Sequence, residues 1–100
     1  MKKIVILGGG ESGVGAAVLA KKQGFDVFVS DASGIKQKYR EVLQKYAIRW
    51  EEGTHTYSEI MDATEVIKSP GIPDKAPLSK EINARHLAII SELEFAGRYT

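Results

Sequence analysis

A glycine-rich run near the N-terminus, KIVILGGGESGVGAAVLAKKQG at residues 3–24, limits the folds that are open to this chain. Residues 3–7 are typical of a buried strand, and small apolar residues follow the glycines at helical spacing. Gly8, Gly10 and Gly13 satisfy G-x-G-x-x-G, in which successive glycines allow a tight turn, close approach of a phosphate, and helix-to-strand packing. The start of the helix adds free N–H groups and the positive end of its dipole. The run therefore predicts a strand, turn and helix that hold a phosphate.

Strands and helices are predicted to alternate along the rest of the chain. Further strands are expected at residues 25–31, 47–50, 63–69 and 87–90. Helices are expected between residues 35 and 46, over one or two turns at 56–62, and at 78–85.

Local signals predict where two of the helices end and begin. Gly24 lies where a glycine relieves the left-handed backbone at a helix C-terminus. Ser91 and Glu94 form an S-x-x-E capping box, and Ile90 and Phe95 occupy the two positions of a hydrophobic staple. A last helix is therefore expected to begin at Ser91.

This alternation predicts an α/β fold of the Rossmann-like, doubly wound kind. We expect a five-stranded parallel sheet of order 3-2-1-4-5 with helices on both faces. Ligands of such sheets bind at the carboxyl ends of the strands, where the winding reverses. Three segments should meet there: the glycine loop at residues 8–13, Asp31 at the end of the second strand, and SPGIP at residues 69–73.

Length and composition exclude several classes of protein. One hundred residues suffice for one domain with a single modest core. Fourteen basic and 13 acidic residues leave a net charge of +1, too small to attract nucleic acid or a membrane surface. The absence of cysteine excludes disulfides, a thiolate nucleophile and a cysteine metal site. Without an apolar leader, the chain is expected to be cytoplasmic.

Several candidate ligand contacts have more than one interpretation. Asp31 occupies the position that meets a ribose in dinucleotide-binding folds, but it would also accept from the N–H groups of a pyrimidine or cap the next turn. The Ser12 hydroxyl suits either a phosphate oxygen or a backbone N–H at the helix start. Glu11 should line the loop with its backbone and turn its side chain to solvent. Pro70 and Gly71 suit a type II turn, whether or not it closes over a ligand.

Other residues are poor candidates for chemistry. His55 and His86 lack neighbours at metal-ligand spacing and lack a partner that would orient a general base. Tyr39, Tyr46 and Trp50 fall on apolar faces and are expected in the core. The usual ATP loop, G-x-x-x-x-G-K-[ST], is absent from these 100 residues.

Three segments together resemble a known family. VILGGGESGVGAA near the start, SPGIP at residues 69–73 and IISELEFA near the end are similar to the amino-terminal domain of the Mur ligases, in the branch that adds D-glutamate. The resemblance covers the whole chain. SPGIP, the helix that begins with Pro-Leu after it, and ISELE are more specific than the glycine loop.

The resemblance implies a single domain, residues 1–100, that holds the uridine diphosphate end of UDP-N-acetylmuramoyl-L-alanine. The implied contacts are Gly10, Glu11, Ser12, Gly13, Asp31, Ala32, Ser33, Ser69, Pro70 and Gly71. The Glu11 backbone and Ser12 hydroxyl would meet the diphosphate, Asp31 would recognise uracil, and Gly71 would close over the base. Family members often carry polar or basic uracil contacts after the aspartate, where this sequence has Ala32 and Ser33.

The resemblance also implies what this chain lacks. ATP, Mg²⁺ and D-glutamate would bind to later domains of the full ligase, which functions in peptidoglycan precursor synthesis. The 100-residue chain would then be a monomeric fragment with no catalytic residue and no cofactor of its own.

Two other functions remain open at this point. An NAD(P)-binding domain of an oxidoreductase would share the glycine motif and Asp31, although this chain lacks the second mononucleotide-binding half. A nucleotide-sensing regulatory module would also be small, and it would bind nucleotide without using SPGIP. A purely structural domain is the least specific alternative.

Overall fold

The computed structural model describes residues 2–68 and 77–99, and in it strands and helices alternate along the chain. The strands are β1 (Lys3–Leu7), β2 (Asp26–Asp31), β3 (Arg49–Glu52), β4 (Glu65–Lys68) and β5 (Ala88–Ser91). The helices are α1 (Glu11–Lys22), α2 (Gln37–Lys45), α3 (Tyr57–Met61), α4 (Pro77–Ala84) and α5 (Glu92–Gly97).

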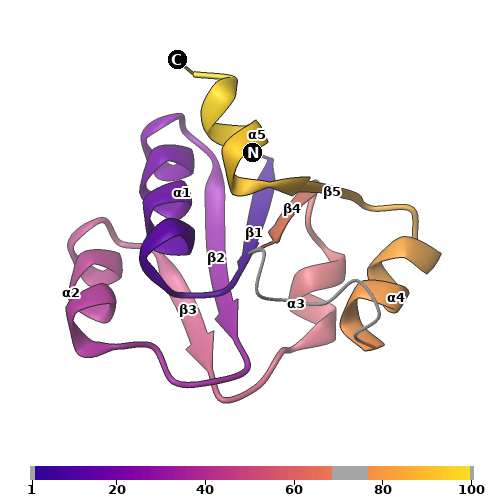
Figure 1. Cartoon of the computed structure of the whole chain (residues 1–100), viewed down its shortest axis with the longest axis horizontal. Helices are drawn as coiled ribbons and strands as arrows, with labels where there is room; N and C mark the ends of the chain where they lie inside the picture. The colour runs from indigo at the N-terminus through magenta and orange to yellow at the C-terminus, as the bar shows by residue number, and fades with distance from the viewer. Residues whose placement is uncertain (1, 69–76, 100) are drawn as a thin grey trace.

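The strands form one parallel sheet in the order β3-β2-β1-β4-β5, which confirms the predicted topology. Helices α1, α2 and α5 cover one face, and α3 and α4 cover the other (Figure 1). Because β1 lies in the middle with helices on both faces, all five of its residues are buried. Because all five strands are parallel, their carboxyl ends lie at the same edge of the sheet.

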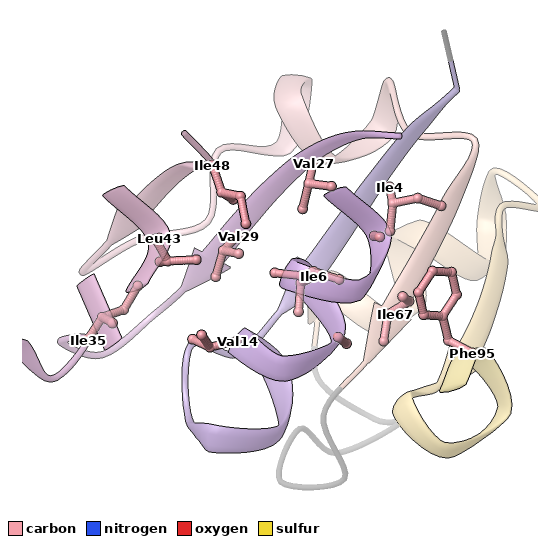
Figure 2. Packing of buried hydrophobic residues seen from close by; sticks show 13 residues of the cluster. Ile4, Ile6, Val14, Val27, Val29, Ile35, Leu43, Ile48, Ile67 and Phe95 are labelled. Atoms are coloured by element: carbon pink, nitrogen blue, oxygen red, sulfur yellow. The ribbon is translucent and has the colours of Figure 1, made fainter. Parts of the chain in front are cut away.

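Side chains that alternate along the central strand divide the core into two clusters. Ile4 and Ile6 of β1 pack with Val29, Ile67 and Phe95 beneath α1, α2 and α5, as Figure 2 shows. Small residues on α1 let this helix approach the sheet closely. The partly buried aromatic side chains of residues 39, 46 and 50 pack against this cluster, in agreement with the prediction that they belong to the core.

The second cluster lies on the opposite face of the sheet. Val5 and Leu7 of β1 pack with Ile60 of α3 and with Leu78 and Ile82 of α4. Both clusters contain side chains of β1, so the helices on either face can bury their apolar side chains only against the sheet.

The predicted bounds of four strands were wrong by one or two residues. The strand β2 begins at Asp26 instead of residue 25, and β4 begins at Glu65 instead of residue 63. Ala47 has a φ of 57°, so the chain is still reversing there, and β3 begins at Arg49 instead of residue 47. His86 adopts a φ of 58° after α4, and β5 begins at Ala88 instead of residue 87. Ala47 is thus a left-handed residue inside the run that was expected to pair, and His86 is a left-handed residue directly before such a run.

The predicted helix-end signals are present. Gly24 has a φ of 91°, as expected for a glycine that ends a helix. The Glu94 N–H donates to the Ser91 hydroxyl over 3.0 Å, so Ser91 ends β5 and caps α5. Among the described helices, none is both long and apolar enough to cross a membrane.

Candidate functional site

The glycine loop lies at the carboxyl edge of the sheet, between β1 and α1. Gly8 has a φ of 112°, which favours glycine, and its N–H donates to the carbonyl of Ser30 over 2.9 Å. This hydrogen bond joins the loop to the end of β2. The first helical hydrogen bond runs from the Val14 N–H to the Gly10 carbonyl over 2.9 Å.

Gly13 and Gly10 have different roles in this loop. A Cβ atom on Gly13 would overlap the backbone carbonyl of Gly8, so the third glycine of the motif is required for packing. A Cβ on Gly10 would meet no atom within 4 Å in the described structure. Gly10 is the N-cap of α1 and, as a glycine, has no side chain that could accept from the first N–H groups of the helix. The start of α1 thus has open space beside Gly10 in the described structure, and a helix N-terminus favours an anion.

Glu11 and Ser12 form the first turn of α1, and both are exposed. A carboxylate at this end of a helix complements the dipole. The Glu11 side chain is on the solvent side, as predicted. Ser12 lies beside the open helix start, within reach of whatever occupies it.

Asp31 uses both carboxylate oxygens to hold the surrounding backbone. Oδ2 accepts from the Gly9 N–H over 2.7 Å, and Oδ1 accepts from the Ser33 N–H over 2.8 Å. The second bond spans two residues and forms an Asx turn. Asp31 thus has the turn-capping role that was one of the three open interpretations, and it also contacts the glycine loop.

Sequence reasoning missed Glu52, which holds the loop after β2. Its Oε2 accepts from the Ile35 N–H over 2.7 Å, and its Oε1 accepts from Arg40 over 3.0 Å. These two hydrogen bonds, first from the Ile35 N–H and then from Arg40, lower the pKa of the Glu52 carboxyl. The Gly53 N–H also donates to the Ser33 carbonyl over 3.0 Å. The exposed backbone of Ser33 is therefore held at its N–H by Asp31 and at its carbonyl by the Gly53 N–H.

A second missed cluster lies on the α3 face of the same edge. The buried Ser30 hydroxyl lies 2.8 Å from Glu51 Oε2 and 2.7 Å from His55 Nδ1. Burial acts to raise the pKa of the Glu51 carboxyl, but hydrogen bonds from Thr56 and Ser30 outweigh it and the pKa is lowered. Because the Ser30 hydroxyl donates to Glu51, His55 is assigned as the Nδ1–H tautomer that donates to Ser30. The cluster anchors the loop that follows β3.

Two consecutive glutamates directly after the predicted strand 47–50, which the structure includes in β3, were the signal for both missed groups. Side chains alternate between the faces of a strand, so Glu51 and Glu52 had to reach different layers. The register pairs Ser30 with Glu51 and Asp31 with Glu52.

The structure brings together two of the three predicted segments. The glycine loop and Asp31 are in direct contact. Ala32 and Ser33 follow Asp31 at the surface. The third segment, with Ser69, Pro70 and Gly71, lies outside the described residues, which resume at α4 after β4 ends at Lys68.

A groove of about 820 Å³ begins beside Ser12 and runs between α1, α4 and α5. Leu93 on its rim is 83% exposed. Glu92 also lines the groove, and neither of its buried carboxylate oxygens has a hydrogen-bond partner among residues 2–68 and 77–99. Among residues 2–68 and 77–99, no three acidic or histidine side chains are grouped as a metal would require.

Comparison with known proteins gives one consistent family. Residues 3–78 match the family model described as "MurD N-terminal domain". The UDP-N-acetylmuramoylalanine--D-glutamate ligase of Bacteroides thetaiotaomicron is 62% identical over 100 residues, which are 100% of this chain and 22% of that protein. The enzyme of the same name from Porphyromonas gingivalis W83 is 59% identical over 97% of this chain and 22% of its own length. The chain thus spans less than a quarter of these relatives.

Solved structures agree on the fold. A murein peptide ligase from Psychrobacter arcticus superposes with a TM-score of 0.89 at 20% identity, over 100% of this chain and 21% of that one. A pseudomurein peptide ligase type C from Methanothermus fervidus has a TM-score of 0.82 at 27% identity, over 100% and 21%. Because the family model covers most of the chain and agrees with the sheet order and glycine loop, this chain belongs to the MurD N-terminal domain family of the Mur ligases.

Proposed function

We propose that this domain binds the uridine diphosphate end of UDP-N-acetylmuramoyl-L-alanine, as the N-terminal domain of a ligase that adds D-glutamate during peptidoglycan precursor synthesis. The observation that carries the proposal is the start of α1, where the glycine N-cap Gly10 leaves open space in the described structure next to the Gly9–Asp31 hydrogen bond. Relatives that are about 60% identical over this whole chain bear the name of that ligase.

In this proposal the backbone at Gly10, Glu11 and Gly13 surrounds the diphosphate, and the Ser12 hydroxyl donates to it. The N–H groups of the first helical turn provide hydrogen bonds without a cationic side chain. Each Asp31 oxygen accepts one backbone N–H and keeps a lone pair, so the carboxylate can still accept from the uracil ring.

Small residues complete the base site in the same proposal. Ala32 and Ser33 leave room for a flat ring beside Asp31. Ser69, Pro70 and Gly71 are assigned to the opposite side of the base from the family resemblance alone, since they lie outside the described residues.

ATP, Mg²⁺ and D-glutamate are assigned to the rest of the full-length ligase. The described residues contain no cluster of metal-ligating side chains, and the 100 residues contain no G-x-x-x-x-G-K-[ST] loop. We expect this chain alone to be monomeric, to bind the nucleotide weakly and to form no amide bond. The full ligase would work in the cytoplasm.

The test is an amide NMR titration of the chain with UDP-N-acetylmuramoyl-L-alanine, UDP and, separately, NAD. Shifts at Gly10, Ser12, Asp31 and Gly71 with the uridine ligands only are the expected result. Shifts with NAD only would contradict the proposal and favour a dinucleotide-binding domain of an oxidoreductase. Equal shifts with every nucleotide would favour a less specific nucleotide-sensing module.

A further inference from the structure

Asp31 connects two loops that both belong to the proposed site. Oδ2 accepts from the N–H of Gly9, inside the glycine loop, over 2.7 Å. Oδ1 accepts from the N–H of Ser33, inside the loop after β2, over 2.8 Å. Both are short bonds to a charged acceptor, which are stronger than bonds between neutral groups. The position of the glycine loop relative to the second loop thus depends on this carboxylate.

Packing beneath these hydrogen bonds brings the same loops into contact. Gly9 is buried, and a Cβ atom there would lie 2.7 Å from the Ile35 Cγ1. Ile35 is itself only 4% exposed, and its N–H is held by Glu52 over 2.7 Å. The glycine loop therefore rests on a side chain whose own backbone is fixed by β3.

Electrostatics alone would argue against an acidic residue at this place. Asp31 forms no ion pair within the described part of the chain, so no cation neutralises its charge there. It lies one hydrogen bond away from the loop to which we assign a diphosphate. Like charges repel, and the repulsion grows where water is excluded. An isolated electrostatic effect of Asp31 on phosphate binding would thus be unfavourable.

We propose that Asp31 is a positioning residue for the diphosphate. By holding the Gly9 N–H, it keeps the glycine loop in the shape that presents the N–H groups at the start of α1 to the phosphates. This benefit outweighs its repulsion, and it is separate from any contact between Asp31 and the base. The inference rests on the proposed function only in that the glycine loop binds phosphate.

The experiment compares inorganic pyrophosphate, which has no base, with UDP. Both are titrated into the 100-residue chain and followed by amide NMR, in the natural sequence and in Asp31→Ala and Asp31→Asn. Asp26→Asn is the matched control, because Asp26 is an acidic residue at the other end of the same strand. The amide spectrum of each variant establishes that it is folded.

We expect Asp31→Ala to weaken pyrophosphate about ten-fold, the loss that corresponds to about one charge-assisted hydrogen bond. Asp31→Asn should lose less, because its single side-chain oxygen can still accept from one of the two N–H groups. If Asp31→Ala does not fold, the isosteric Asp31→Asn carries the test. Asp26→Asn should change neither affinity.

A spectroscopic readout separates positioning from a general structural role. In the natural chain the Gly9 amide proton should resonate downfield because it donates to the Asp31 carboxylate, and this downfield shift should be lost in Asp31→Ala. The Gly53 amide, which donates to a backbone carbonyl in the adjacent loop, should keep its shift.

The outcomes distinguish this inference from the function proposed above. Unchanged or tighter pyrophosphate binding in both Asp31 variants, with weaker UDP binding, would overturn the positioning role and leave a base contact. Pyrophosphate binding that depends on Asp31, without preference for UDP over NAD, would remove the uridine assignment and support the positioning role. Failure of the natural chain to bind either ligand would overturn both.

Discussion

At the scale of single residues, the three motif glycines are constrained by different neighbours. Gly8 needs its positive φ, Gly13 needs its missing Cβ, and Gly10 has neither requirement. Gly10 has a φ of −83° and a ψ of −168°, an extended conformation that any residue adopts. The fold therefore does not require a glycine at position 10, whereas the phosphate contact that we propose there would.

Gly13→Ala is expected to destabilise the chain by about 3 kcal/mol, because the new methyl group meets a backbone carbonyl that cannot rotate away. Gly15→Ala, two residues further along the same helix and open to solvent, should stabilise it by about 0.5–1 kcal/mol. Urea unfolding of both variants measures these changes. Similar stabilities for the two variants would contradict this account of helix-to-strand packing.

Gly10→Val should lower the free energy of unfolding by only about 1 kcal/mol, because valine is a poorer N-cap than glycine but the backbone is extended and its surroundings are open. The same side chain would stand where the phosphate approaches, so UDP binding should be lost. Titration with UDP, after a melting curve, checks both statements. Retained UDP affinity would place the phosphate elsewhere.

Glu52 should make stability depend on pH. Its folded-state pKa is lowered by the Ile35 N–H and Arg40, so its contribution is present above the pKa of the unfolded chain and is lost as pH falls through the lower folded value. Glu52→Gln should therefore reduce the loss of melting temperature between about pH 6 and pH 3. Glu41→Gln, at an exposed glutamate of α2, is the control. Equal pH profiles for all three proteins would count against this role.

At the scale of elements, α5 shows how a short helix is held. It has six residues, too few to be stable in isolation. Phe95 is fully buried against the sheet, and Arg98 forms two hydrogen bonds with Glu65 of β4 over 2.9 and 2.7 Å. These bonds are the main cause of the lowered pKa of the Glu65 carboxyl. Tertiary contacts and the Ser91 cap therefore determine where α5 lies.

Phe95→Ala is expected to lower the free energy of unfolding by about 3 to 5 kcal/mol, because it opens a cavity beneath α5. Leu93→Ala in the same helix should change it by less than about 0.5 kcal/mol, since Leu93 is 83% exposed. Thermal or urea unfolding compares the two. A large loss for Leu93→Ala would show that the rim of the groove is covered in solution.

At the scale of the whole molecule, the two core clusters share β1 and should unfold together. Trp50, the only tryptophan, packs against the core cluster beneath α1, α2 and α5. Ile82 is buried in the second cluster, on the face that α3 and α4 cover. We expect Trp50 fluorescence and the amide signal of Ile82 to report the same urea midpoint. Two separate midpoints would show that the layers are independently stable.

Sequence by itself determined the order of the elements, the parallel sheet, its 3-2-1-4-5 arrangement and the place of the glycine loop. These depend on local periodicity, on glycines at specific turns and on the handedness of crossovers, all of which can be read along the chain. Boundaries after α2 and α4 were wrong because Ala47 and His86 adopt left-handed conformations that nothing in their side chains requires.

Only the tertiary structure decided what the side chains at the carboxyl edge do. Asp31 meets Gly9, Ser30 meets His55, and Glu52 meets Ile35 across 17 to 25 residues of chain. These contacts depend on the parallel registers that pair Leu7 with Ser30 and Asp31 with Glu52, and a shift by one residue would turn each side chain to the opposite face. Register is set by packing on both faces of the assembled sheet at once. The sequence therefore predicted that Asp31 and the glycine loop lie together, but not which atoms are bonded, and it did not identify the partners of Ser30 and Glu52.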